Sequence, residues 1–188
     1  MKFLKNNFVV KFTISLFLVS ITVGILAFFA FKPELINQIE NFKNLILTTN
    51  QNVFLIDIGI ITMIFIASIS IIGLPLIIFY IFYEGMSIGF TAGAFIYTFK
   101  IKGFGFYLLF LMATKLIFLL LIFYFIIVSI RFTYKIIGAL VYKNKENLYD
   151  TVINHFARFV IILILIILNS SMIYFLTNKF LTIFIDLI

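Results

Sequence analysis

Cysteine is absent from this 188-residue sequence, and charged residues make up only 11% of it. Without cysteine the chain forms no disulfide, no thiolate metal site and no cysteine nucleophile. An average globular domain is about one quarter charged, whereas here 64% of residues are hydrophobic and the mean hydropathy is +1.26. A water-soluble fold of this size cannot bury so much apolar surface. The composition therefore predicts an integral membrane protein surrounded mainly by the lipid bilayer.

The net charge of +7 is distributed along the chain without a long basic run. Lysines and arginines stand at the ends of apolar stretches, which is typical of anchoring against anionic lipid. Proteins that bind nucleic acid instead gather basic residues into one patch or stripe. We therefore expect the lipid bilayer, and no nucleic acid, as the partner of these charges.

Five apolar segments match the roughly 20 residues that cross the hydrocarbon of a bilayer. The predicted fold is an all-α, polytopic transmembrane helix bundle that forms one domain over residues 1–188. Lys32-Pro33-Glu34, after the first segment, is no small-residue cleavage site, so we expect this segment to be retained. The predicted spans are residues 12–31, 53–72, 76–99, 104–130 and 159–178, with an outer loop at 32–52 and a cytoplasmic segment at 131–158.

The distribution of lysine and arginine predicts the orientation of these spans. With the amino terminus inside, the cytoplasmic segments hold eight basic residues and the outer segments hold five. Loops on the cytoplasmic side usually carry the excess. We therefore expect the amino terminus inside and the carboxyl terminus outside, in a multi-pass protein of the cell membrane.

A hinge separates the second and third spans. Residues 58–83 carry no charge and the apolar run resumes after Glu84, which makes the stretch too long for one crossing. Pro75 lacks a backbone donor and disfavours helix at the residue before it. The break is therefore expected at Gly73-Leu74-Pro75, with Gly73 and Pro75 as the hinge residues.

Gly85, Gly89 and Gly93 recur at four-residue spacing in the third span. Residues at this spacing lie on one helix face, and glycine lets another backbone come close. This pattern favours a helix-packing face. The alternative is a substrate path lined by unwound backbone, as in transporters with broken helices.

Glu84 and Lys115 are the two charges that this assignment of spans places well inside the hydrocarbon. An intramembrane charge is expensive and is therefore a candidate functional residue. At 1.5 Å per residue, Glu84 lies about 13 Å and Lys115 about 23 Å from the inner ends of their helices. Three interpretations follow: an ion pair, a snorkelling or water-contacting lysine, and a proton or ion relay.

No catalytic motif is found in the sequence. His155 is the only histidine, and without a second ligand nearby we expect it to be a polar residue at the membrane interface. Phosphate loops, nucleophile elbows, paired-histidine zinc motifs and dinucleotide-binding turns are all missing. We therefore expect no enzyme activity, no metal site and no cofactor.

Short motifs between residues 69 and 137 provide a further clue. They are Ile69-Ser70-Ile71-Ile72-Gly73-Leu74-Pro75, Glu84-Gly85, Gly89-Phe90-Thr91-Ala92-Gly93, Lys102-Gly103-Phe104 and Lys135-Ile136-Ile137. Together they resemble the stage II sporulation protein M family of polytopic membrane proteins. The resemblance implies a scaffold for engulfment during sporulation. It also implies membrane-associated peptidoglycan hydrolases as partners, which would carry out the hydrolysis themselves.

The main alternative function is a small transporter or permease subunit. It would use Glu84 and Lys115 around a site near the middle of the membrane. A homo-oligomer is compatible with either function. A flux assay on Glu84→Gln distinguishes the transporter from the scaffold.

Overall fold

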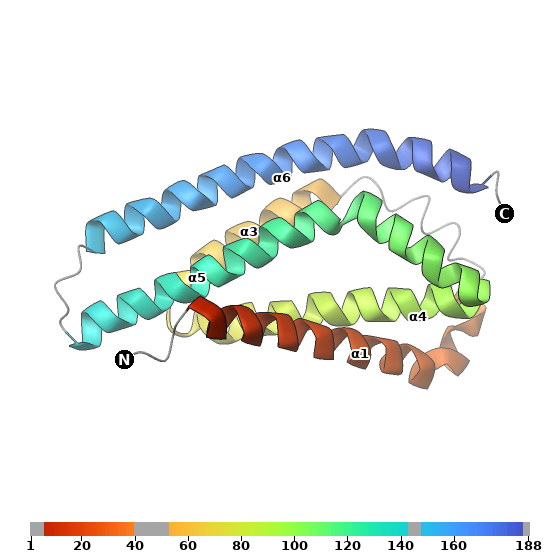
Figure 1. The fold of residues 1–188 in the computed structure, drawn as a ribbon, viewed down its shortest axis with the longest axis horizontal. Helices are drawn as coiled ribbons and strands as arrows, with labels where there is room; N and C mark the ends of the chain where they lie inside the picture. The colour runs from red at the N-terminus through yellow and green to blue at the C-terminus, as the bar shows by residue number, and fades with distance from the viewer. Residues whose placement is uncertain (1–5, 40–52, 143–147, 186–188) are drawn as a thin grey trace.

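The computed structural model of the chain describes residues 6–39, 53–142 and 148–185. These residues form five α-helices, which confirms the predicted all-α class. Figure 1 shows how they are arranged. In chain order they are α1 (Asn6–Ile39), α3 (Val53–Ser68), α4 (Gly73–Thr114), α5 (Leu116–Tyr142) and α6 (Leu148–Ile185).

The helices extend beyond most of the predicted spans. In the predicted outer loop, residues 32–39 belong to α1 and residues 40–52 lie outside the described part of the chain. The predicted cytoplasmic segment is largely helical, since α5 continues to Tyr142 and α6 begins at Leu148. Hydropathy locates the part of a helix that suits lipid, but a helix can continue into water beyond it. The predicted boundaries at 31, 130 and 159 therefore lie inside longer helices.

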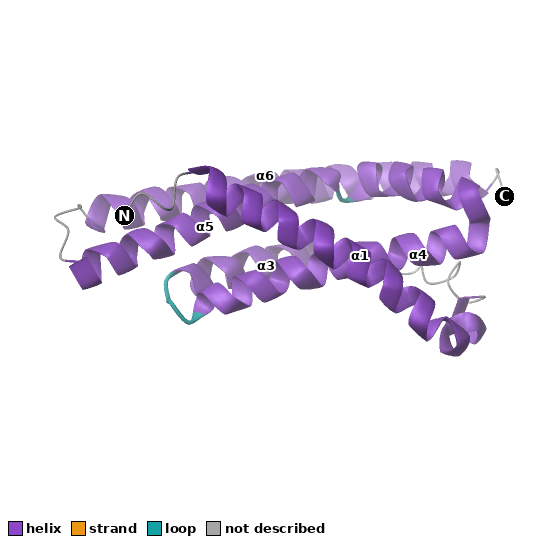
Figure 2. Ribbon diagram, turned by 60° about the horizontal axis from the view of Figure 1, so that its bottom comes forward, coloured by secondary structure: helices purple, strands orange, loops and turns teal. Residues whose placement is uncertain are grey.

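The second span is shorter than predicted. α3 ends at Ser68, and residues 69–72 form a turn that is visible as a loop in Figure 2. Gly73 begins α4, and a Cβ at this position would overlap the backbone of Ala67. Pro75 stands in the first turn of α4, where its missing N–H has no helical acceptor. Gly73 and Pro75 therefore lie at the junction of the two helices.

The predicted fourth span, 104–130, is not one helix. α4 passes its predicted end at residue 99 and kinks at Lys100, whose φ of 54° and ψ of −140° are non-helical. It then runs back to Thr114 (Figure 1). The chain breaks again at Lys115, and α5 starts at Leu116. The turn predicted at residues 100–103 is therefore a kink at Lys100, and Lys115 divides the returning segment.

The main hydrophobic core lies between α3, α4, α5 and α6. Its completely buried residues include Ile61 and Ile64 of α3, Ile77 of α4, Phe125 of α5 and Ile166 of α6. A smaller cluster, with Ile88 and Phe95 of α4, continues toward the kink. α1 packs mainly on α4, and Figure 2 shows it crossing one side of the bundle.

Four helices contain apolar stretches long enough to cross a membrane: Phe8–Phe31, Gly73–Tyr97, Leu116–Ala139 and Leu148–Ser170. The chain is thus a multi-pass membrane protein. The apolar stretch of α3, Leu55–Ser68, is too short, because its 14 residues reach about 21 Å whereas the hydrocarbon is about 30 Å thick. The expectation of five full spans is corrected to four long spans and one short apolar helix.

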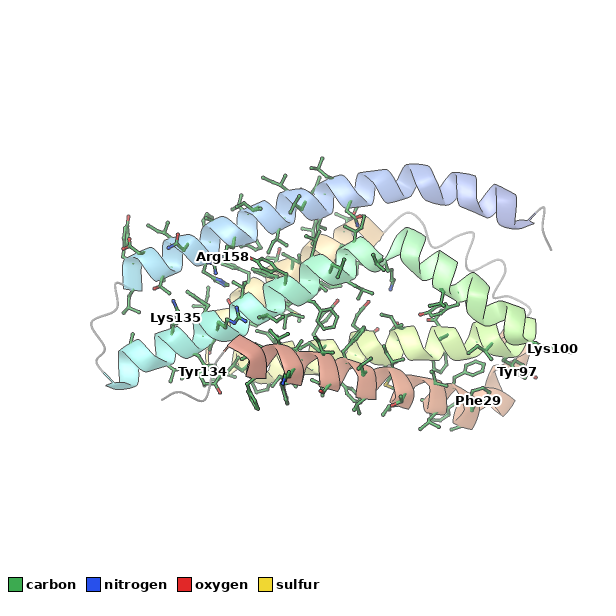
Figure 3. The ribbon with its side chains drawn as sticks, in the orientation of Figure 1. Phe29, Tyr97, Lys100, Tyr134, Lys135 and Arg158 are labelled. Carbon is green, nitrogen blue, oxygen red and sulfur yellow. The ribbon has the colours of Figure 1, made fainter. Side chains whose placement is uncertain are left out.

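Aromatic and basic residues lie toward both ends of the bundle. Figure 3 shows Phe29, Tyr97 and Lys100 toward one end, and Tyr134 and Lys135 toward the other. Tyrosines and basic side chains concentrate at the two interfaces of a bilayer, where an apolar body and a polar tip are both accommodated. This arrangement fits helices that run from one membrane surface to the other. The predicted orientation of the amino terminus stays a prediction.

Candidate functional site

The glycine face, formed by Gly85, Gly89 and Gly93 on α4, lies against α1. A Cβ on Gly89 would overlap the backbone of Ile21, and one on Gly85 would overlap the Ser20 hydroxyl. A Cβ on Gly93 would come within 3.0 Å of the Phe28 side chain.

α1 contributes a glycine of its own to this contact. A Cβ on Gly24 would overlap the carbonyl of Met86 on α4. Small residues on both helices thus bring two backbones together, which is how membrane helices associate without a hydrophobic driving force between them. The backbone of α4 is helical across residues 85–93. The glycine face is therefore occupied within the chain by α1.

Glu84 and Lys115 form an ion pair. The Lys115 Nζ lies 3.6 Å from Glu84 Oε1, and the Tyr80 hydroxyl donates a hydrogen bond of 3.4 Å to Oε2. The side chain of Glu84 is 10% exposed and that of Lys115 is 45% exposed. The two residues are predicted at different distances from the inner ends of their helices. They nevertheless make contact, because the helix breaks at Lys115, between the end of α4 and the start of α5. Of the three interpretations left open by the sequence, the geometry corresponds to the ion pair.

Asp57 is a third intramembrane charge that the sequence analysis missed. It is 8% exposed and shares the buried face of α3 with Ile61, Ile64 and Ser68. The predicted span at 53–72 places Asp57 near its outer end, so the sequence predicts only Glu84 and Lys115 well inside the hydrocarbon. Its position four residues before Ile61 and seven before Ile64 was the available signal, because these intervals follow one helix face.

Asp57 lies in the same region as the ion pair. Its electrostatic neighbours are Lys115, which attracts it, and Glu84, which repels it, and the Ser170 hydroxyl of α6 lies close to it. We call Asp57, Glu84 and Lys115 the charge cluster. Its members come from α3, from α4 and from the break before α5, so tertiary packing brings together residues far apart in sequence.

His155 is buried between helices of the bundle, and its predicted place at the membrane interface stays a prediction. The residue is only 3% exposed, and its ring stacks on Phe132 with 3.9 Å between ring centroids. The ring also stacks on Phe65 and Phe125, at 5.5 Å and 5.7 Å. Aromatic surroundings hold the flat imidazole much as they hold a phenylalanine. The sequence alone does not predict this aromatic enclosure of His155, because the three rings come from other helices, α3 and α5.

Hydrogen bonds fix His155 at the junction of three helices. The Ser68 hydroxyl donates to the carbonyl of Phe65 at 2.6 Å, so its oxygen is free to accept from His155 Nε2, 2.8 Å away. The Thr133 hydroxyl of α5 donates to the Ser68 carbonyl at 2.6 Å. The neutral tautomer with a proton on Nε2 satisfies this network. His155, Ser68 and Thr133 therefore tie α6, α3 and α5 together.

Within the described residues, no group of three or more His, Asp or Glu side chains could hold a metal ion. The pairing of His155 with Ser68 is enclosed by aromatic rings and has a structural role. The geometry instead provides a tight helix contact at the glycine face and a buried charge cluster. Both belong to the interior of a membrane bundle.

Comparison with known proteins identifies one family. A family model described as stage II sporulation protein M matches residues 13–174 of the 188. No curated protein and no solved structure matches the chain. The matched range begins in α1 and ends in α6, so it includes the glycine face, the charge cluster and His155. It extends well beyond residues 69–137, which carried the resemblance in the sequence.

Proposed function

The chain belongs to the stage II sporulation protein M family, and from this premise we propose that it is a non-enzymatic membrane scaffold. Its partners would be membrane-associated enzymes that degrade peptidoglycan, held at the septal or engulfing membrane during sporulation. The chain would position these enzymes and leave the hydrolysis to them. The family match over almost the whole chain is the observation that carries the proposal.

The architecture supports this function. Helices account for nearly all of the described residues, and the longest ones are long enough to span a membrane. In the described part there is no separate globular unit that could house a soluble active site. A protein built in this way acts on partners through helix faces in the membrane or through its ends.

The occupied glycine face limits where such partners bind. Gly85, Gly89 and Gly93 already contact α1, so a partner helix would have to displace α1 to use them. Partner contacts are therefore proposed on the outward faces of the bundle or on its ends. The outer loop, predicted at 32–52, lies largely outside the described residues.

Affinity purification from native membranes tests the scaffold function. We expect the tagged full-length chain, solubilised in mild detergent, to co-purify with peptidoglycan hydrolases identified by mass spectrometry. A multi-pass membrane protein of similar size and equal expression serves as the control. If the intact chain is recovered from sporulating cells without any such enzyme above the control, the scaffold proposal fails.

A second candidate function, a small transporter or permease subunit, is favoured by the Glu84–Lys115 ion pair beside a broken helix. Transporters place polar groups and interrupted helices near the middle of the membrane. If the chain transports a solute, proteoliposomes should show substrate-dependent flux that Glu84→Gln abolishes, because the substitution removes the buried negative charge. Absence of flux, or flux that survives Glu84→Gln, counts against this function.

A further inference from the structure

Among the described residues, the charge cluster contains two buried carboxyl groups and only one cationic side chain. Counted as whole residues, Asp57 is 8% exposed and Glu84 is 7% exposed, and Lys115 is the cation that acts on both. With both carboxyl groups ionised, the cluster has a net charge of −1. An uncompensated charge inside a bilayer is energetically unfavourable. The cluster therefore needs one more positive charge.

The two carboxyl groups lie at matching depths. Asp57 is eleven residues before the end of α3 at Ser68, and Glu84 is eleven residues after the start of α4 at Gly73. Because α3 and α4 are joined by the turn at 69–72, each carboxyl group lies about 16 Å from that turn. With the turn at one membrane surface, this depth is near the middle of hydrocarbon about 30 Å thick. Water at the membrane surface therefore cannot easily screen their repulsion.

The contacts of Glu84 differ from those of Asp57. Glu84 accepts from the Tyr80 hydroxyl through Oε2 and faces Lys115 through Oε1, which is buried and has no hydrogen-bond donor. Both contacts suit a carboxylate. Among the residues whose side chains are described, Tyr107, whose hydroxyl donates to the Ile88 carbonyl, and Ser170 also lie near the cluster. Neither phenol nor hydroxyl carries charge near neutral pH.

We propose that the charge cluster is an intramembrane proton-binding site: Asp57 holds one exchangeable proton, and Glu84 stays ionised against Lys115. A bound proton makes the cluster electrically neutral with no further ligand. It also removes the repulsion between the two carboxyl groups, because paired carboxylates that cannot both ionise share one proton. The site requires neither the scaffold nor the transporter function.

Labelling with dicyclohexylcarbodiimide tests this site directly. This apolar reagent reacts with carboxylic acids in their protonated form. The acid proton moves to one carbodiimide nitrogen, and the carboxylate oxygen bonds to the central carbon, so the whole reagent is added. We expect the full chain in detergent to gain one reagent at Asp57 at neutral pH, located by mass spectrometry. Labelling should decline as the pH is raised, when the proton is lost.

Charge-changing variants sharpen the test. Glu84→Gln leaves Asp57 as the only partner of Lys115, which favours the ionised form, so labelling of Asp57 should fall by about tenfold or more. Lys115→Met leaves both carboxyl groups without a cation, so Glu84 should be labelled as well. Asp150→Asn, at an exposed position in the first turn of α6, is the matched control and should leave labelling unchanged.

Three results would overturn the proposal. The first is that Asp57 stays unlabelled at every pH in the wild-type chain. This result does not depend on the folding of any variant. The second is that Glu84→Gln does not lower the labelling of Asp57, although the variant elutes at the same volume as the wild type. The third is protection by sodium ions at constant pH, which would assign the extra positive charge to a metal cation.

Discussion

Gly89→Leu is expected to separate α1 from α4 and to destabilise the bundle strongly. Even a Cβ at this position would overlap the backbone of Ile21. A leucine cannot be accommodated by a change of rotamer, because the obstacle is backbone. We expect a loss of about 3 kcal/mol in the free energy of unfolding, at the upper end of the range for overpacking. Unfolding by SDS in mixed micelles, followed by circular dichroism, measures this loss.

Gly59→Leu is the matched control for this variant. It makes the same change in α3, where a Cβ would meet nothing within 4 Å. The control should have the same free energy of unfolding as the wild type, apart from a small stabilisation because leucine has a higher helix propensity than glycine. If Gly89→Leu were as stable as Gly59→Leu, the contact between α1 and α4 would be wrong. Co-purification of partners with each variant would then show whether this contact also matters for assembly.

His155→Ala is expected to have the second large effect. The substitution leaves a cavity beside Phe132, Phe65 and Phe125, and it removes the hydrogen bond to Ser68. Loss of a buried aromatic side chain usually lowers stability by about 3 kcal/mol or more. The same unfolding assay should show this decrease, because α6 loses a buried hydrogen bond to α3.

Two further substitutions separate packing from hydrogen bonding at this site. His155→Phe keeps a flat ring among the phenylalanines and loses the bond to Ser68, so we expect a decrease of only about 1 kcal/mol. Asn154→Ala, at the exposed neighbouring position, should change nothing. Equal stabilities of His155→Ala and Asn154→Ala would show that His155 is not enclosed as described.

Several features of the fold could be predicted because they depend on single residues or short stretches. A stretch such as Phe12–Phe31 prefers lipid whatever surrounds it, so the membrane class and the apolar helices follow from hydropathy. A helix break next to Gly73 and Pro75 follows from local backbone chemistry, although the turn itself lies just before them, at residues 69–72. The same reasoning misplaced helix ends, because Tyr142 and Leu148 continue helices beyond the apolar stretches.

The candidate sites required more than local information. The spacing of Gly85, Gly89 and Gly93 indicated a packing face, but did not identify α1 as the helix that covers it. Glu84 and Lys115 could be selected as intramembrane charges, whereas their contact depended on the break in the chain at Lys115.

The amino-acid sequence by itself determined that this protein lies in a membrane, which segments are apolar helices, and where small residues allow close packing. Only the tertiary structure decided that Asp57 joins the ion pair in the interior and that aromatic rings enclose His155. The physical reason is that transfer into lipid is a sum over individual residues. Contacts depend on which helices become neighbours and at what depth their side chains meet.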